Sequence, residues 1–309
     1  MSASAPASGR PWSGLWHLAD PKISITSAAA MLVGVAVAVH EGHFAPGWLA
    51  VTALALFGME VAKNAWGEVV DFDSGTDLAV APEDRTDFSG GKRVLVDRLL
   101  TRGQTWAIAA VFGGVGVGLG AWIVFGREPA VLWLGLVGLV LGWSYHGPPL
   151  RLCYRGLGEL DVVLCYGPLI VLSVYWIQAG PGRVDVLWLA VPLGLLIAAF
   201  LWVNEFPDHR ADAAAGKRNL VVRLGPHRAS RVLPWLHAAA YAVLVAAPFV
   251  ARLPSAAWFG LLAVPFSVYA CVQTWRAPFD FYRRRPVQPA SLLAFCVYAL
   301  GSGLGVLLA

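Results

Sequence analysis

Long apolar runs alternate with shorter polar links along almost the whole chain. Each run holds about 20 residues, the number with which an α-helix crosses the hydrocarbon core of a bilayer. The pattern therefore predicts an all-α, polytopic membrane protein with nine transmembrane helices. The expected spans are residues 23–41, 47–66, 104–125, 130–147, 160–178, 186–205, 230–251, 256–275 and 289–308.

The composition favours a membrane protein over a soluble one. Hydrophobic residues make up 58% of the 309 residues and charged residues only 14%, whereas about a quarter of the residues of a soluble domain are charged. The 14 tryptophans suit a protein that is anchored at two membrane–water interfaces. Residues 1–17 lack the pattern of a cleaved signal peptide, so we expect a flexible tail there, within a single domain that covers residues 1–309.

The basic residues are distributed unequally between the two sides of the membrane. All but three of the 23 arginines and lysines precede span 1 or lie in and around the links after spans 2, 4, 6 and 8, and the exceptions are Arg127, Arg183 and Arg252. Because cytoplasmic loops are enriched in basic residues, we expect an integral protein of the cell (inner) membrane with its N-terminus inside and its C-terminus outside. The net charge of +4 follows this topology, and no nucleic-acid partner is expected.

Two cytoplasmic links are much longer than the others. They cover about residues 67–103 and 207–229 and mix charged residues, glycines and short apolar patches. Long links in a compact protein are commonly functional. We therefore expect both to form ordered caps over the cytoplasmic side.

Polar residues gather on one face at the cytoplasmic end of span 2. At a helical rotation of about 100° per residue, Asn64, Gly67 and Asp71 fall within about 40° of Glu60, and Glu68 flanks them. The following Ser-Gly pair favours a turn. That turn can return Asp77 to the same mouth.

Span 6 repeats this arrangement with Asn204, Asp208 and Asp212. Pro207 should kink or end the helix, since it cannot donate its backbone hydrogen bond. Ionisable residues at membrane depth usually face a bundle interior or a water-filled cavity. Two carboxylate clusters that face each other would repel unless cations lie between them, and oxygen ligands of this kind suit Mg²⁺ held together with substrate phosphates.

Basic residues accompany both acidic clusters. Lys92 and Arg93 follow the glycine pair at residues 90–91, a loop suited to approach a phosphate, and Lys217 and Arg151 lie in the other cytoplasmic links. Such residues also satisfy the ordinary charge asymmetry of membrane proteins. Carboxylates, a divalent cation and basic groups within reach of a membrane together indicate an anionic head group on a lipidic tail, and a prenyl diphosphate fits this description.

Five segments, taken in order, resemble the UbiA superfamily of intramembrane prenyltransferases, and most of all its 1,4-dihydroxy-2-naphthoate branch in menaquinone biosynthesis. They are LADPKISITSAAAMLVGVAVA, EVVDFDSGTD, GGKRVLVDRLLT, YHGPPLRLCYRGLGE and VNEFPDHRADAAAGKRNLVVRLG. The similarity runs from about residue 18 through span 6, and the last three spans match only in hydropathy. The resemblance implies nine helices around a central cavity with cytoplasmic cap loops, and Mg²⁺ that bridges a prenyl diphosphate to two aspartate motifs.

Site residues follow from the resemblance position by position. It implies metal and diphosphate roles for Asp71, Asp77, Asn204, Asp208 and Asp212, with Asp71 and Asp208 essential for catalysis. The implied phosphate contacts are Lys22, Arg93, Arg151 and Lys217. Tyr145, before the Pro-Pro turn, is expected to shield or stabilise the developing cation, whereas His146 is assigned no role beyond solvating that turn.

One departure from the family pattern concerns the first motif. Where the family has an Asn-Asp pair, this chain has Gly67 and Glu68. Glu68 keeps a carboxylate and is expected to bind metal. Asn64, one turn earlier on the same face, is expected to replace the missing amide as a substrate-binding residue.

The expected reaction is Mg²⁺-dependent transfer of a polyprenyl group from an allylic diphosphate to a small aromatic acceptor, with 1,4-dihydroxy-2-naphthoate favoured. Glu159 and Asp161 would orient the acceptor or accept its proton, or else pair with Arg155. Other acceptors remain open, namely 4-hydroxybenzoate, homogentisate or an ether-lipid glycerol, as does a membrane terpene cyclase. A cation-coupled transporter is the alternative outside enzymes, although transport sites are expected at the midplane and not at one membrane face.

Overall fold

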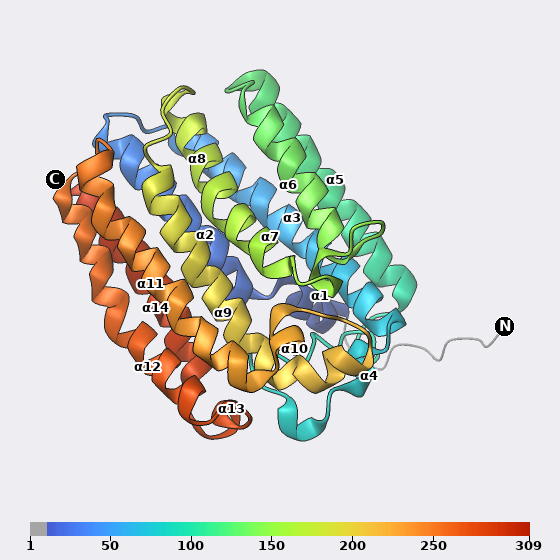
Figure 1. Cartoon of the computed structure of the whole chain (residues 1–309). Coiled ribbons are helices and arrows are strands. Elements are labelled where there is room, and N and C mark those ends of the chain that lie inside the picture. Colours follow the sequence, from blue (N-terminus) through green and yellow to red (C-terminus); the bar gives the residue numbers. More distant parts are fainter. Residues whose placement is uncertain (1–10) are drawn as a thin grey trace.

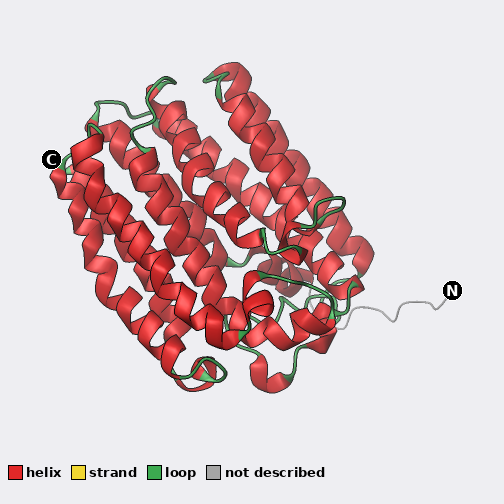
Figure 2. Ribbon diagram, viewed as in Figure 1, coloured by secondary structure: helices red, strands yellow, loops and turns green. Residues whose placement is uncertain are grey.

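The computed structural model describes residues 11–309, and that part of the chain contains helices and loops but no strand (Figure 2). The long helices run side by side as a bundle (Figure 1). They are α2 (Pro21–His40), α3 (Pro46–Asp73), α5 (Arg102–Gly126), α6 (Val131–His146), α9 (Leu187–Ala214), α11 (Pro226–Val250) and α14 (Val287–Leu307). Two further rods are composite: α7 (Gly158–Leu164), a π-turn at Cys165–Leu169 and α8 (Ile170–Ala179), and a 3₁₀ segment at Ser255–Ala263 followed by α12 (Val264–Arg276).

Every apolar range expected from the sequence lies on one of these rods, but nine transmembrane helices are not confirmed. Within residues 11–309, six rods are long and apolar enough to cross a bilayer. A seventh arises if α1 (Pro11–Ala19) and α2, bent by 45°, count as one span. The other two ranges fall on α6, which has only 16 residues, and on α3, whose apolar half already contains Glu60 and Lys63.

The acidic helices are longer than the sequence pattern indicates. α3 continues to Asp73 and α9 to Ala214, so the first residues of both expected cap loops are helical. Pro207 lies inside α9 and does not end it, because residues on either side, Phe206 and Ala211, are buried and hold the helix in place by packing. The acidic side chains are therefore placed by rigid helices.

The core is centred on α9. Most of its side chains are buried, and they pack in one cluster with residues of α2, α8, α11 and α14. α5 is the opposite case, since large apolar side chains such as Val111, Val115 and Phe125 are exposed. A soluble protein rarely exposes so continuous an apolar surface, and on a membrane protein it is the lipid-facing side.

Short helices cap one end of the bundle (Figure 1). They are α4 (Thr76–Ala79), a 3₁₀ turn at Pro82–Asp84, α10 (Leu220–Leu224) and α13 (Phe281–Arg284). α1 lies at the same end, and residues 11–17 of the segment expected to be a flexible tail belong to it. The remainder of that segment lies outside the described residues.

Candidate active site

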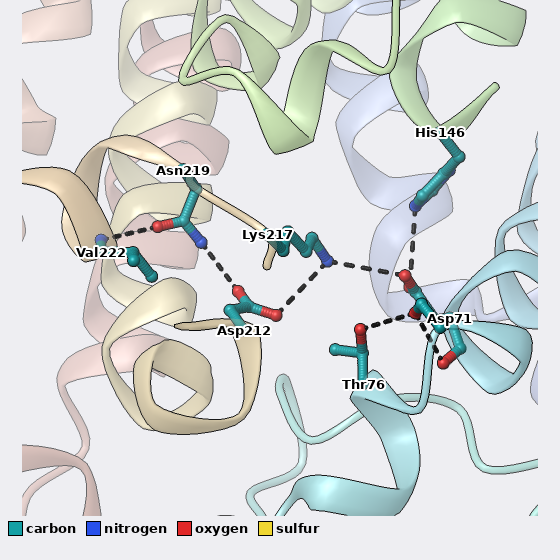
Figure 3. Close-up of polar contacts among 8 residues, drawn as sticks. Asp71, Thr76, His146, Asp212, Lys217, Asn219 and Val222 are labelled. Atoms are coloured by element: carbon teal, nitrogen blue, oxygen red, sulfur yellow. Dashed lines mark hydrogen bonds and ion pairs between the residues drawn. The ribbon is translucent and has the colours of Figure 1, made fainter. Parts of the chain in front are cut away.

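The two acidic helix ends meet across one lysine. The Nζ atom of Lys217 lies 3.8 Å from Oδ1 of Asp71 on α3 and 3.6 Å from Oδ1 of Asp212 on α9 (Figure 3). Burial alone would lower the pKa of Lys217, but Asp212 and Asp71 outweigh that effect and raise it well above its usual value. Lys217 is therefore a permanent cation between the two carboxylates.

The turn after α9 is built to hold this arrangement. Gly216 has a φ of +76°, a conformation that glycine adopts without steric cost, and the chain then returns so that the Lys217 amide donates to the Asp212 carbonyl oxygen at 2.8 Å. Asn219 donates to the Asp212 carboxylate at 2.8 Å and accepts from the Val222 amide, which caps α10 (Figure 3). Asn219 was not among the residues singled out from the sequence.

Asp77 joins the cluster from α4. Its side chain is buried, and burial together with the charges of Asp71 and Glu68 raises the pKa of Asp77 to about 8. Arg93 donates to its backbone carbonyl at 3.2 Å. The Gly90–Gly91 pair passes so close that a Cβ atom on Gly91 would overlap the Asp77 carboxylate. Steric exclusion therefore explains why a glycine occupies position 91.

The remaining residues of α9 face the cap. Asp208 lies near Asp212, Lys217 and Asp77 and faces the backbone amide of Gly90. Its Oδ1 atom is buried and has no hydrogen-bond partner among the described residues. Asn204 accepts a 3.0 Å hydrogen bond from Gln288 on α14, and Gln288 also contacts Ser89. Asn204 thus lies where α9, α14 and the cap converge.

The expected phosphate contacts differ in their surroundings. Lys22 donates to the Asp87 carbonyl and lies over the Phe88 ring, and Arg93 pairs with Asp97 at 3.0 Å. Arg151 lies with its guanidinium 4.2 Å from the centre of the Tyr154 ring. It also lines a cavity of about 320 Å³ next to Asp71, with Val70, Asp73, Ser74, His146 and Pro148.

Asn64 and Glu68 have polar partners in the protein itself. Asn64 donates to the Leu18 carbonyl at 2.8 Å and so links α3 to α1. Glu68 accepts from the Leu95 amide at 2.7 Å and so fixes the cap loop on α3. Both side chains therefore have a structural role in the protein, and their roles in metal or substrate binding stay predictions.

His146 is, with Asn219, a site residue that the sequence reasoning missed. Its Nε2 atom lies 3.7 Å from Oδ2 of Asp71 (Figure 3), and the side chain is buried. Its ring packs on Gly67, where an added Cβ atom would come within 2.7 Å of Cε1. The only sequence signal was the unusual glycine at position 67, and a single sequence does not show what fills the space beside it.

Tyr145 and the start of α7 lie beside this cluster. The Nζ atom of Lys63 lies 5.7 Å from the centre of the Tyr145 ring, and the ring meets the His146 imidazole edge to face. Glu159 accepts from the Leu220 amide at 2.5 Å, while Arg155 donates to the Pro149 carbonyl, so the alternative pairing of Glu159 with Arg155 is not observed. Glu159 instead holds α10 in place.

Within residues 11–309, no three acidic, histidine or cysteine side chains are placed to hold a metal ion by themselves. Two carboxylate oxygens are nevertheless free to bind a cation. The Oδ1 atoms of Asp71 and Asp208 are buried and receive no hydrogen bond from the described residues. Mg²⁺ is usually held by one or two carboxylates plus substrate phosphates. The donor set fits an ion that is completed by a bound diphosphate.

The sequence matches the model of the UbiA prenyltransferase family over residues 27–300. The chain is 29% identical over 289 residues to a 1,4-dihydroxy-2-naphthoate octaprenyltransferase of Mycobacterium tuberculosis, a match that covers 91% of this chain and 89% of that protein. It is also 29% identical over 231 residues to a 2-carboxy-1,4-naphthoquinone phytyltransferase of Synechocystis, covering 74% of this chain and 72% of the relative. The family assignment made from the five segments is confirmed.

Solved structures with the same fold come from archaea. A UbiA homologue from Aeropyrum pernix superposes with a TM-score of 0.69 at 20% identity and covers 92% of this chain and 97% of its own. A UbiA homologue from Archaeoglobus fulgidus, bound to DMAPP and Mg²⁺, superposes with a TM-score of 0.59 at 17% identity, with coverage of 96% and 99%. At these identities the likeness concerns the fold.

Proposed function

This chain belongs to the UbiA prenyltransferase family, and we propose that it transfers a polyprenyl group from an allylic prenyl diphosphate to 1,4-dihydroxy-2-naphthoate, with Mg²⁺ as cofactor. The observation that carries the proposal is the meeting of two acidic helix ends, α3 and α9, across Lys217. The names of the relatives favour a naphthoate acceptor. The Mg²⁺ and DMAPP bound to the archaeal homologue favour the metal and the diphosphate donor.

Asp71, Asp77, Asp208 and Asp212 are the residues proposed to hold Mg²⁺ with the diphosphate. When bound, the ion supplies positive charge that stabilises the departing diphosphate. Lys217 adds a fixed cation at the same place, and a preorganised charge of this kind stabilises a developing anion without reorganisation. Arg93 and Arg151, on the two sides of the cluster, are the proposed contacts of the outer phosphate oxygens.

The allylic carbon of the donor would lie toward Tyr145, whose electron-rich ring packs against His146 beside the acidic cluster. The apolar interior beyond it excludes water, which would otherwise capture the allylic cation. The acceptor ring attacks that cation with formation of a C–C bond, and the ring proton leaves to a base. Asp161 is the proposed base or orienting group, since its carboxylate is buried and accepts only a weak hydrogen bond among the described residues, from the Cys165 thiol at 3.9 Å, with the ammonium group of Lys63 near enough to interact electrostatically.

The test is turnover by the purified protein. It would be incubated with prenyl diphosphates of several lengths and with labelled naphthoate, 4-hydroxybenzoate, homogentisate and glycerol acceptors, with and without EDTA. We expect a prenylated naphthalene product that requires Mg²⁺. Asp71→Asn and Asp208→Asn should abolish it, and Glu83→Gln, an exposed acid on the same cap, should leave it unchanged.

Other products would redirect the assignment. Prenylation of a different acceptor would replace the naphthoate, and a cyclic terpene formed without acceptor would indicate a cyclase. Absence of diphosphate release with every donor would overturn the enzymatic proposal and favour the transporter. Full activity in both aspartate variants would refute the metal–diphosphate site while leaving the reaction in place.

A further inference from the structure

We infer that His146 is a positioning residue of the diphosphate site and that it takes over the work of the side chain missing at Gly67. The inference rests on the proposed function and adds a residue that neither the family motif nor the sequence pattern assigned. It explains two features together: an imidazole beside Asp71, and a glycine where the family has asparagine.

The first step concerns the space beside α3. Positions 67 and 71 are four residues apart on one helix, so their side chains are neighbours on the same face. An asparagine at position 67 could therefore donate to the Asp71 carboxylate. At Gly67 the same space is filled from α6, because a Cβ atom there would lie 2.7 Å from Cε1 of His146, 3.1 Å from Nδ1 and 3.3 Å from Nε2. His146 and any larger residue at position 67 exclude each other.

The second step concerns what the imidazole does there. Its Nε2 atom faces Oδ2 of Asp71 at 3.7 Å, whereas Lys217 approaches the other oxygen, Oδ1. The Asp71 carboxylate thus lies between nitrogen atoms of two different segments (Figure 3), and both distances exceed that of a direct hydrogen bond. Outer partners that hydrogen-bond a metal-binding carboxylate fix its direction, and their loss costs about tenfold to a hundredfold in metal affinity or activity.

The third step is that His146 is buried with part of its polarity unsatisfied. Its side chain is 9% exposed, it packs against the Tyr145 ring, and Nδ1 has no hydrogen-bond partner among the described residues. A buried polar nitrogen without a partner is costly, so the placement is not accounted for by hydrogen bonding within the protein. We assign it to the alignment of Asp71 with the diphosphate and its ion.

The test is a double-mutant cycle of Gly67→Asn and His146→Ala, read by calorimetric binding of a prenyl thiolodiphosphate in the presence of Mg²⁺, and by kcat and KM for each substrate. We expect each single variant to weaken binding of the analogue, and to lower kcat/KM for the donor, by about tenfold to a hundredfold. The double variant should recover to within about threefold of wild type, because asparagine then fills the space that the imidazole leaves. His146→Gln should retain more binding than His146→Ala.

Matched controls separate positioning from folding. Gly114→Asn changes a glycine of α5 with open space around it, and His227→Ala removes a histidine at the start of α11, outside the site; neither should move the affinity for the analogue. Thermal unfolding in detergent shows whether any variant is misfolded. The inference would be overturned if the loss of affinity in the double variant equalled the product of the losses in the two single variants, or if His146→Ala bound the analogue as tightly as wild type. Absence of turnover by the wild type, with binding of the analogue intact, would count against the proposed function alone.

Discussion

Two glycines of the cap share the same backbone conformation but differ in what surrounds them. Gly91 and Gly216 both have a φ of +76°. A Cβ atom on Gly216 would meet open space, whereas one on Gly91 would overlap the Asp77 carboxylate. The pair therefore separates the cost of the backbone conformation from the cost of a steric clash.

Replacement of each glycine by alanine tests this difference. Gly216→Ala should lower the free energy of unfolding by about 1–2 kcal/mol, the cost of a left-handed conformation for a residue with a Cβ atom. Gly91→Ala should lower it by a further 1–3 kcal/mol or so, as overpacking does, and should also reduce prenyl transfer because Asp77 moves. Chemical unfolding in detergent micelles measures both changes, and equal losses in the two variants would contradict the proposed closeness of Gly91 to Asp77.

Replacement of Lys217 is expected to change both the stability of the protein and the response of that stability to Mg²⁺. Lys217→Met leaves the buried carboxylate of Asp212 and the partly buried one of Asp71 without their cation, and loss of one partner of a buried ion pair costs on the order of 3 kcal/mol. Added Mg²⁺ should raise the unfolding temperature of this variant more than that of the wild type, since the ion supplies the missing charge. Arg218→Met changes the exposed neighbour and should behave like wild type, and the same Mg²⁺ response in all three proteins would refute the argument.

At the scale of elements, one aspartate joins three segments at the capped end of the bundle. Asp84, in the 3₁₀ turn after α4, accepts from Arg210 on α9 at 2.5 Å and from Tyr282 and Arg283 on α13 at 2.8 and 2.6 Å. Burial favours a higher pKa for Asp84, but these hydrogen bonds outweigh it and hold the pKa below its ordinary value. Three segments of the chain are thus joined at one carboxylate.

The lowered pKa gives the cap a defined response to acid. A depressed carboxyl pKa contributes stability at every pH above the unfolded value of about 3.9, and this stability is lost as the pH falls through the folded value. A spin label at position 83 should therefore be immobile at neutral pH and become mobile only when the pH falls below about 3.9. Asp84→Asn should make the label mobile at neutral pH as well, and a label that stays immobile in that variant would show that the cap is held by other contacts.

The positions of the helices were largely predictable from the sequence. The exceptions are helix ends near charged residues and near Pro207. Apolar runs indicate where a helix lies in the bilayer, so all nine ranges coincide with helical rods. The same criterion stops at the first charged residues and ends these spans at residues 66 and 205, whereas α3 continues to Asp73 and α9 to Ala214, as the shared helical faces of Asp71 and Asp212 had indicated. The expectation that Pro207 could end the helix was wrong, because tertiary packing on both sides of a proline can keep a helix continuous.

The candidate site was predictable in its acids and less so in their partners. One helical face was enough to group Asp71 with its neighbours, and the second to group Asp208 with Asp212, and the fold brings the two groups together around Lys217. His146 and Asn219 come from other segments, and periodicity within one helix contains no information about them. Asn64 lies on the expected face of α3, but its amide bonds to Leu18 on α1, a contact that no local pattern indicates.

For the whole molecule, the distribution of caps and basic residues predicts which side of the membrane each end occupies. The caps gather at one end of the bundle (Figure 1), together with most of the basic residues. We expect this end to be cytoplasmic and the C-terminus outside, which requires an odd number of crossings. With α1 and α2 counted as one span, α3 and α6 must then either both cross the membrane, for nine crossings, or both not cross it, for seven.

Fusion of a reporter to the C-terminus tests the topology. Alkaline phosphatase at that end should be active in whole cells, and green fluorescent protein there should be dark when exported through the general secretion pathway. The reverse pattern would place both ends on one side and remove one crossing. A cysteine at position 181, in the link between α8 and α9, should react with a membrane-impermeant maleimide added to intact spheroplasts, whereas one at position 86 should react only after lysis.

The contacts of Asp84 also fix an order of events during synthesis. Its partners Arg210 and Arg283 follow it by 126 and 199 residues, so the ribosome must make nearly the whole chain before this carboxylate is satisfied. Until α13 emerges, the loop that carries Asp77 and the glycine pair lacks the contacts of Asp84 with Tyr282 and Arg283. We therefore expect the proposed metal–diphosphate site to be among the last parts of the protein to mature, so that a nascent chain that has inserted most of its helices cannot yet act on its substrate.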